Sequence, residues 1–305
     1  MLYSSQGLPF GLFIVALPAW FASQGLDAAE IGQFIAIVFL PWSFKLIAGP
    51  IMDKFTFAPM GRRRPWVLGA QLGIIISFLL VSVLSPDPKE GFMVLAALGF
   101  MCNFFGALQD VAVDGMAIDI LEEDERAQAN AYMYGGQIAG ISLATSLGGH
   151  ALASYGLSVA AIIMLVLVFL TMLVPLFLRE REGERVLPWS DGEAAAEVTA
   201  SSGRSWKEIV GSLLKVLFLP LSILLVMAEG LSRITAGLVT TINPVITVQE
   251  LGWQQTAYSD WYAICGVIAA VVGVIVGRRS LLAELTRYAM PSSVQVRIFA
   301  QPLYF

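Results

Sequence analysis

The chain has 305 residues, of which 57% are hydrophobic and only 13% are charged, and its mean hydropathy is +0.75. Soluble globular domains carry about 25% charged residues, so this composition excludes an ordinary soluble domain and indicates a polytopic membrane protein. The formal net charge of -5 gives no basic surface for a nucleic acid. We therefore expect the lipid bilayer, and no nucleic acid, as a partner.

Apolar stretches long enough to cross a bilayer recur along the chain. A spanning helix needs about 20 apolar residues, and we predict about eight such helices in an all-α polytopic bundle. They begin near Gly7, Ile31, Trp66, Phe92, Ala129, Ser158, Gly211 and Thr256, and the last ends near Gly277. The first stretch lacks a basic n-region and reaches full spanning length, so we expect it to stay in the membrane.

Basic residues mark one side of the predicted membrane topology. The connections after the first, third, fifth and seventh helices hold Lys89 as their only basic residue. Those after the second, fourth and sixth hold Lys54, Arg62, Arg63, Arg64, Arg126, Arg179, Arg181, Arg185, Arg204 and Lys207. By the positive-inside rule, this asymmetry predicts a cytoplasmic N-terminus in a cell inner (plasma) membrane.

A polar segment divides the chain into two membrane units. Residues 183–205, GERVLPWSDGEAAAEVTASSGRS, are small and polar and contain Pro and Gly, which is typical of a flexible cytoplasmic linker. We predict a six-helix N-terminal half over residues 1–182 and the first two helices of a C-terminal half over residues 206–277. The tail, residues 278–305, is too polar and interrupted to span, so we expect the C-terminal half to be incomplete.

The loop between the second and third predicted helices, residues 49–66, reads GPIMDKFTFAPMGRRRPW. Glycine permits a tight turn, an aspartate accepts hydrogen bonds at a helix end, and arginines pair with acidic helix ends. The loop therefore supplies a candidate gating contact, formed by Gly49, Asp53, Gly61, Arg62 and Arg63. The alternative is a basic loop that only sets topology.

The fourth predicted helix carries acidic residues in the stretch from Asn103 to Asp119, NFFGALQDVAVDGMAID. A charge at the centre of a spanning helix costs roughly 2.5 to 3.5 kcal/mol on insertion scales, so it normally faces a bundle interior or a wet cavity. Asp110 and Asp114 lie one turn apart on one face. Because two carboxylates this close cannot both ionise cheaply, we expect at least one to favour its protonated form, which suits proton coupling. Structural pairing with Lys45 or an arginine is the alternative.

Four further polar side chains are candidates for substrate binding or charge pairing. Lys45 can serve as the counter-ion of an aspartate on the fourth helix, contact an anionic substrate, or snorkel to the cytoplasmic interface. Gln109 can contact substrate or bond a neighbouring helix. Glu229 and Arg233, an i,i+4 pair in the seventh helix, either neutralise each other within the bundle or bind the charged ends of a substrate.

Other features of the spanning segments have structural interpretations. Asp119 lies near the cytoplasmic end of the fourth helix, where we expect it to be solvated. The small-xxx-small pattern from Gly136 to Gly140 predicts close helix packing, and Gly266 in the last helix offers a partner surface. For His150, we favour an interface histidine with a partner over a proton relay.

Several stretches together resemble the AmpG-type muropeptide permeases and the related acetyl-coenzyme A transporters of the major facilitator superfamily. They are SSQGLPFGL (residues 4–12), LPWSFKLIAGPIMDKF (40–55), GRRRPW (61–66) and ALQDVAVDGMAIDIL (107–121). The loop also resembles the cytoplasmic signature of the superfamily, with a longer spacing from Asp53 to Gly61. The resemblance implies two helical halves that meet at a substrate cavity near the bilayer midplane.

The fourth-helix motif leaves two substrate classes open. In muropeptide permeases it resembles TQD-x3-D-x2-R-x-D, and this chain has Ala117 where that arginine is expected. The Asp-Gly-x-Ala run that begins at Asp114 is more similar to the acetyl-coenzyme A branch. An anhydromuropeptide-like metabolite is our first expectation and acetyl-coenzyme A the second.

We therefore expect a secondary active transporter, coupled to protons, that moves a polar or anionic small molecule across the inner membrane. The alternative is a truncated, non-transporting membrane protein, because eight helices leave one side of the central cavity open. The chain has one histidine and no HExxH, GxSxG or Gly-rich phosphate loop, and Cys102 and Cys265 lack metal-ligand spacing. We expect no enzyme activity, catalytic residue, cofactor or metal site.

Overall fold

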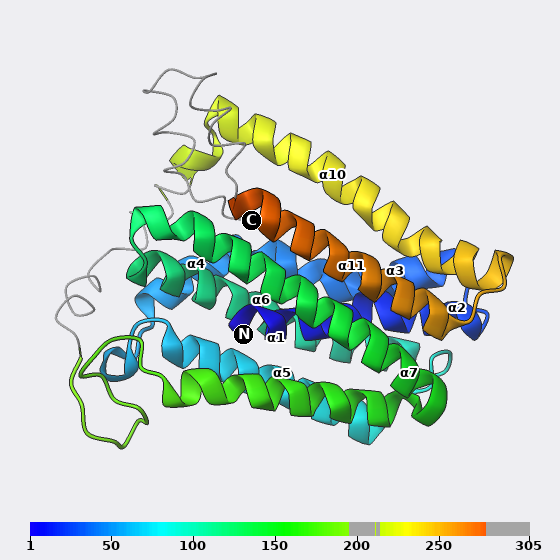
Figure 1. The fold of residues 1–305 in the computed structure, drawn as a ribbon, viewed down its shortest axis with the longest axis horizontal. Helices are drawn as coiled ribbons and strands as arrows, with labels where there is room; N and C mark the ends of the chain where they lie inside the picture. Colours follow the sequence, from blue (N-terminus) through cyan, green and yellow to red (C-terminus); the bar gives the residue numbers. More distant parts are fainter. Residues whose placement is uncertain (195–210, 212–213, 279–305) are drawn as a thin grey trace.

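A computed structural model describes residues 1–194, 211 and 214–278 of the chain, and all regular elements in this part are helices. The helices run along one common long axis (Figure 1). Three predicted segments lie wholly or partly outside the described residues. They are the linker, the start of the C-terminal half, and the non-spanning tail from residue 279 on. The all-α architecture is confirmed.

The first spanning segment lies at the centre of the bundle. It runs from α1 (Leu2–Phe10) through a π-helical stretch, η1 (Gly11–Ala16), into α2 (Leu17–Ser23). In its most apolar window, 89% of the residues are buried. This segment therefore packs against protein on all sides, which explains why its apolar residues show no single lipid-facing stripe.

The second spanning segment is broken in the middle. Its first part, α3 (Ala28–Phe39), begins with a capping box in which Asp27 and Glu30 accept each other's backbone N–H. A 3₁₀ stretch, η2 (Leu40–Phe44), then leads into α4 (Lys45–Lys54), and the segment bends by 46°. Pro41 has no backbone N–H to donate and 3₁₀ turns are wound more tightly, so the helix axis changes direction here.

The next helices are α5 (Arg64–Leu84), α6 (Phe92–Ile120) and α7 (Glu123–Phe177). A straight helix of the length of α7 would extend roughly 80 Å, more than twice the hydrocarbon core of a bilayer. Gly156 interrupts it with a φ of +81°, a left-handed conformation that favours glycine. Figure 1 shows the resulting two arms, joined by a turn, which are the predicted fifth and sixth helices.

The last described helices are α10 (Pro220–Pro244), a π-helical stretch η4 (Val245–Glu250) and α11 (Gln255–Arg278). We predicted the seventh helix to begin near Gly211; Gly211 and residues 214–217 are helical, and α10 begins at Pro220 after a break at Phe218 and Leu219. Leu219 is extended, with φ and ψ of -66° and 138°, because a proline disfavours the helical conformation of the residue before it. None of the residues in the most apolar window of α10 is buried.

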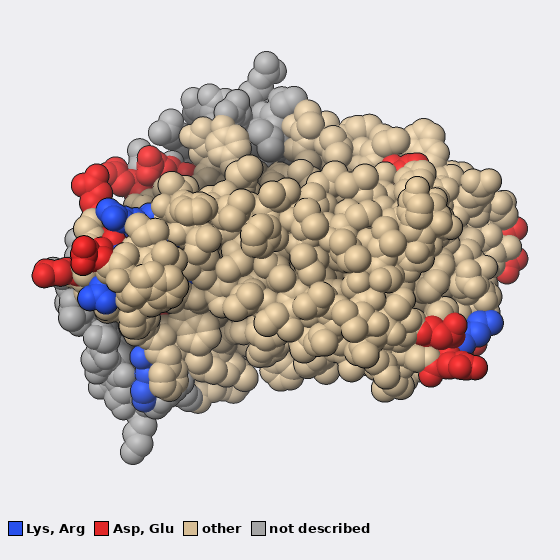
Figure 2. All heavy atoms as spheres, turned by 90° about the horizontal axis from the view of Figure 1, so that it is seen from below, with Lys and Arg blue, Asp and Glu red and all other residues tan. Residues whose placement is uncertain are grey.

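Five described helices are long and apolar enough to cross a membrane, or six if the bent segment from α3 to α4 is one span. With α7 taken as two arms and α11 added, the described helices correspond to the eight predicted segments. Figure 2 shows that charged side chains on one face gather almost entirely at the two ends of the bundle. The uncharged band between them is typical of a protein that spans a bilayer.

Glycines allow α7 to approach its neighbours closely. A Cβ atom on Gly140 would meet the backbone of Ser4 in α1, and one on Gly7 would meet the carbonyl oxygen of Gln137. On α11, a Cβ atom on Gly266 would lie 2.8 Å from the Ser142 hydroxyl oxygen. The predicted small-xxx-small pattern therefore packs the first arm of α7 against α1, while α11 packs nearby on the same arm.

We predict that Gly140→Ala destabilises the bundle, because the added methyl group collides with backbone atoms that cannot rotate away. Overpacking of this kind costs about 1–3 kcal/mol. The thermal unfolding midpoint of the purified protein in detergent should therefore fall. The matched control is Gly69→Ala in α5, where nothing lies within 4 Å of the added Cβ atom. Equal midpoints for both variants would contradict this packing.

Candidate functional site

Asp110 lies in the middle of the bundle and pairs with a lysine from the broken second span. It is 4% exposed on α6 and forms an ion pair with Lys45, whose side chain is 16% exposed. Lys45 is the first residue of α4, directly after the 3₁₀ stretch. Of the three predicted roles of Lys45, the geometry shows the contact that the counter-ion role requires.

An aromatic side chain holds the surroundings of this pair. The Lys45 ammonium lies 4.9 Å from the centroid of the Trp42 ring, a cation–π contact. The same ring stacks on Phe39, and its Nε1 donates to the buried Asn103 Oδ1 over 3.1 Å. Trp42 therefore connects the polar face of α6 to the break in the second span. Our sequence reasoning missed it, because the indole hydrogen bond bridges positions far apart in the sequence.

Asp114 lies one turn further along α6 and has a different partner. Its carboxylate accepts a hydrogen bond from the hydroxyl of Tyr3 in α1. The two aspartates are thus held by different helices, Asp110 by α4 and Asp114 by α1. Sequence reasoning did not single out Tyr3, although it lies directly before the SSQGLPFGL stretch.

Gln109 points toward α1. It is fully buried, and its Nε2 donates to the Leu2 carbonyl over 3.0 Å and to the Ser5 hydroxyl over 2.5 Å. This is the helix-to-helix contact that was one of its two predicted roles. Because the Gln109 side chain is fully buried, these bonds hold α6 and α1 together.

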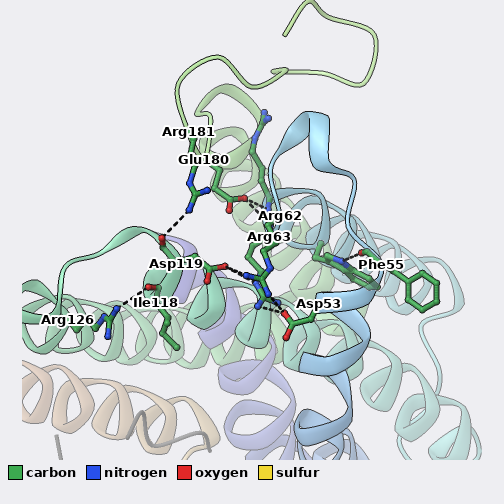
Figure 3. A network of polar contacts seen from close by, with 11 residues as sticks. Asp53, Phe55, Arg62, Arg63, Ile118, Asp119, Arg126, Glu180 and Arg181 are labelled. Carbon is green, nitrogen blue, oxygen red and sulfur yellow. Dashed lines mark hydrogen bonds and ion pairs between the residues drawn. The ribbon is translucent and has the colours of Figure 1, made fainter. Parts of the chain in front are cut away.

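The gating-loop residues gather at one end of the bundle, called the basic end. Figure 3 shows Asp53, Arg62, Arg63 and Asp119 pointing toward one another. The Asp53 Oδ1 atom lies 2.9 Å from Arg62 and 2.5 Å from Arg63, and the Asp119 Oδ2 atom lies 3.5 and 3.4 Å from them. Two cations and two anions therefore neutralise each other in this set, called the arginine cluster. Each carboxylate contacts both guanidinium groups.

The arginine cluster corrects our expectation for Asp119. We expected a solvated carboxylate, but its side chain is only 19% exposed and pairs with both arginines. A Cβ atom on Gly115 would lie 2.7 Å from the Arg63 Nε atom, so only a glycine leaves this guanidinium its place against α6. Gly115 and Asp119 are four residues apart on one helical face, a spacing that could have indicated their shared partner.

The two glycines of the loop differ in role. Gly61 has a φ of +99°, so it makes a turn that other residues adopt only with strain. Gly49 lies inside α4 and makes no turn. Of the two, only Gly61 uses the conformational freedom of glycine.

The Glu229 and Arg233 side chains of α10 form the predicted i,i+4 ion pair. Arg233 Nε donates to Glu229 Oε1 over 2.6 Å. The arginine side chain is 61% exposed and the glutamate side chain 33%, so the pair lies on an open face of α10 and not within the bundle. Mutual neutralisation agrees with this geometry.

The end opposite the basic end carries a second polar contact between helices. His150 Nε2 on α7 lies 2.9 Å from Asp260 Oδ2 on α11, and the Ser146 hydroxyl donates to Asp260 Oδ1 over 2.6 Å. The histidine thus has a partner at a helix interface. Within the described ranges, no group of three or more His, Cys, Asp or Glu side chains is placed to hold a metal ion.

Arg64, next to the arginine cluster, binds backbone rather than carboxylates. Its guanidinium is buried and donates to four carbonyl oxygens over 2.6–2.8 Å, those of Pro175, Leu176, Arg185 and Val186. It thus caps the end of α7 and holds the start of the predicted linker against it. Nothing in the run of three arginines, residues 62–64, distinguishes the third from the other two.

Two glutamates after α7 complete this contact. Glu180 Oε2 accepts the backbone N–H groups of Arg63 and Arg64, over 2.9 and 3.0 Å, at the start of α5. Glu184 is fully buried and accepts the N–H of Arg181 over 3.0 Å. Burial raises the pKa of Glu184 above its ordinary value, and the hydrogen bond from Arg181 opposes this rise.

Comparison with known proteins gives a family for this arrangement. The family model of the Major Facilitator Superfamily matches residues 1–288. The anhydromuropeptide permease of Escherichia coli K12 is 33% identical over 122 residues, which cover 40% of this chain and 24% of that protein. An uncharacterised protein of Haemophilus influenzae is 29% identical over 141 residues, covering 45% and 32%. The matched region of the chain thus spans less than a third of the length of each of these curated relatives.

We predict that Asp119→Asn destabilises the protein, because Arg62 and Arg63 lose one of their two anionic partners in a half-buried cluster. Loss of a partner by a charged group away from water costs about 1–3 kcal/mol. The thermal unfolding midpoint in detergent should fall. The control is Asp191→Asn, the same change at an exposed position of the linker. A midpoint equal to that of the control would restore the solvated interpretation.

The buried Glu184 predicts a pH dependence. Because its folded-state pKa is raised, its contribution to stability is fully present below the ordinary glutamate pKa of about 4.3 and is lost as pH rises through the raised value. Glu184→Gln removes this loss, so the unfolding midpoint of the variant relative to the parent should increase with pH. The exposed Glu193→Gln is the matched control. A difference independent of pH would contradict the assignment.

Proposed function

This chain belongs to the major facilitator superfamily, a family of transporters rather than enzymes, and we propose that it acts as a proton-coupled secondary transporter. In this proposal it moves a polar or anionic metabolite across the inner membrane, with its N-terminus and its basic end in the cytoplasm. Residues 1–182 would form the N-terminal half and residues 206–277 the start of the second. The buried ion pair of Lys45 and Asp110 carries the proposal.

The ion pair offers a direct way to couple a proton to an anion. A buried charge is tolerated only while it is paired, and removal of one partner costs about 3–5 kcal/mol. Protonation of Asp110 leaves the Lys45 ammonium without its carboxylate. An anionic group on a substrate could then take the place of that carboxylate. Proton and substrate would therefore bind together, and the doubly loaded state would differ in charge distribution from the empty one.

Asp114 provides a second place for a proton. Its partner Tyr3 is on α1, so protonation of Asp114 would change a contact between α1 and α6. A protonated carboxyl group can donate as well as accept, whereas the ionised form only accepts. Such a change would alter the contact between α1 and α6. A rocking motion of the bundle would require these two helices to move against each other.

The arginine cluster would act as the cytoplasmic gating contact. It joins the end of α4, the start of α5 and the end of α6 through charge-assisted bonds. These helices also carry or adjoin the ion pair, so a shift of α4 against α6 at the pair would act on the cluster. Gly49, inside α4, would serve this motion by keeping the helix surface small beside Val111, whose Cγ1 atom would lie 3.9 Å from a Cβ atom at this position.

For the substrate, we propose an anhydromuropeptide-like molecule first and acetyl-coenzyme A second. Both carry anionic groups that a lysine can bind. The identity to the Escherichia coli anhydromuropeptide permease supports the first. Ala117, where an arginine would be expected, leaves the second open. Gln109, Glu229 and Arg233 stay candidates for substrate contact in this proposal.

A non-transporting role is the second candidate. It is favoured by α10, whose apolar window has no buried residue and whose Glu229–Arg233 pair lies on an open face. A transporter normally encloses such a helix between its two halves. Failure of the unmodified chain to take up either substrate in vesicles would favour this role.

We predict that Asp110→Asn and Asp114→Asn lower proton-driven uptake. The chain is reconstituted in liposomes with an inward proton gradient, and the uptake of labelled anhydromuropeptide and of labelled acetyl-coenzyme A is compared. At least one variant should lose about tenfold or more in initial rate, equivalent to about 1.4 kcal/mol. Asp191→Asn is the matched control and should match the parent.

The double variant Lys45→Gln with Asp110→Asn separates coupling from folding. It removes both buried charges, so it should fold without an unpaired charge, and it should no longer respond to the proton gradient. If both single aspartate variants transport as well as the parent, the proton-site proposal is wrong.

A further inference from the structure

An apolar groove lies on the side of the bundle near the basic end. Its volume is about 550 Å³, and every side chain that lines it is apolar. One wall is α5, with Leu68 and Leu72, and another is the end of α7, with Met172 and Leu176. The third wall comes from the predicted linker, through Leu187, Pro188 and Trp189.

The linker wall is held in place by hydrogen bonds. Arg64 binds the carbonyl oxygens of Arg185 and Val186 and so fixes the chain directly before the wall. The Ser190 hydroxyl then accepts the N–H groups of Val186 and Leu187, both over 3.0 Å, which closes a tight turn. These hydrogen bonds therefore hold the apolar residues of the linker against the groove.

Trp189 is unusual because it lines the groove and yet is 80% exposed. An indole that is mostly exposed to water is costly, whereas the same indole at the boundary between lipid headgroups and hydrocarbon is favourable. The two linker residues that follow it, Ser190 and Asp191, are polar and charged. Trp189 thus has the placement of an interfacial anchor.

The groove continues into a surface that faces lipid. Toward the C-terminal end of α5, exposed apolar residues continue after Leu72 at helical spacing on one side of the helix. They are Ile76, Leu79 and Val83, which are 45–71% exposed. In a spanning helix such a stripe contacts hydrocarbon. The groove therefore adjoins this stripe on α5, and Trp189 is among its lining residues.

We propose that this groove binds an acyl chain of a bilayer phospholipid and that Trp189 anchors the linker at the headgroup level above it. Lipid hydrocarbon is the occupant because it is the medium that the groove adjoins, and because the lining side chains are apolar apart from the indole N–H of Trp189. The site does not involve Lys45, Asp110 or the arginine cluster. It therefore does not depend on the proposed transport activity.

A photoactivatable phosphatidylcholine with a diazirine on its acyl chain tests this site. The full chain is reconstituted in vesicles that contain this lipid, irradiated and digested. We expect label on the peptides that carry Leu68 to Leu72 and Leu187 to Trp189. Leu68→Trp fills the groove and should reduce this labelling severalfold. Leu80→Trp, on the lipid-facing side of the same helix but outside the groove, should not.

Fluorescence gives a second measurement that does not depend on a groove-filling variant. In vesicles of phosphatidylcholine brominated near the headgroup end of the acyl chain, the parent should lose more emission than Trp189→Phe does. Bromines near the terminal methyl group should quench Trp189 less. The proposal is overturned if the parent loses no more emission than Trp189→Phe does in the brominated vesicles. It is also overturned if Leu68→Trp and Leu80→Trp are labelled to the same extent.

Discussion

Charge compensation inside an apolar bundle is the constraint on which this structure depends. Each buried charge described above has a partner that matches its chemistry. Lys45 takes a carboxylate, the two arginines of the cluster share two carboxylates, and Arg64 takes four carbonyl oxygens. A buried charged group without a partner would lower the stability of the folded protein by several kcal/mol. The polar pairs thus join α6 to α1, to α4 and to the start of α5.

Backbone shape is the second condition, because these partners meet only if the helices approach closely. Gly140 lets α7 touch α1, and Gly115 leaves room for the Arg63 guanidinium beside α6. The 3₁₀ stretch before Lys45 redirects the second span, so that the lysine starts a new helix beside Asp110. Small residues and a helix break therefore bring the helices close enough for the ion pairs to form.

The sequence predicts the helices well because apolar length and turn residues are local properties. For this reason the predicted start of the sixth helix near Ser158 agrees with the kink at Gly156 in the structure. The predicted i,i+4 pair of α10 is likewise present. It predicts partners less well. Tyr3 and Asp114 are 111 positions apart, and Arg64 and Val186 are 122 apart, so no periodicity connects them. Asp119 was misjudged because its exposure depends on a loop from another part of the chain.

The bonds of Arg64 have a consequence for the mechanics of the chain. The N–H of Glu193 donates to the carbonyl of Gly183, and Arg185 Nε donates to the carbonyl of Gly192, so residues 183–193 form a closed unit docked on α5 and α7. More of the predicted linker is therefore anchored to the bundle than its polar composition indicates, at least as far as Glu193. In the proposed transporter, an anchored segment shortens the tether between the two halves. A shorter tether raises the effective concentration of one half near the other.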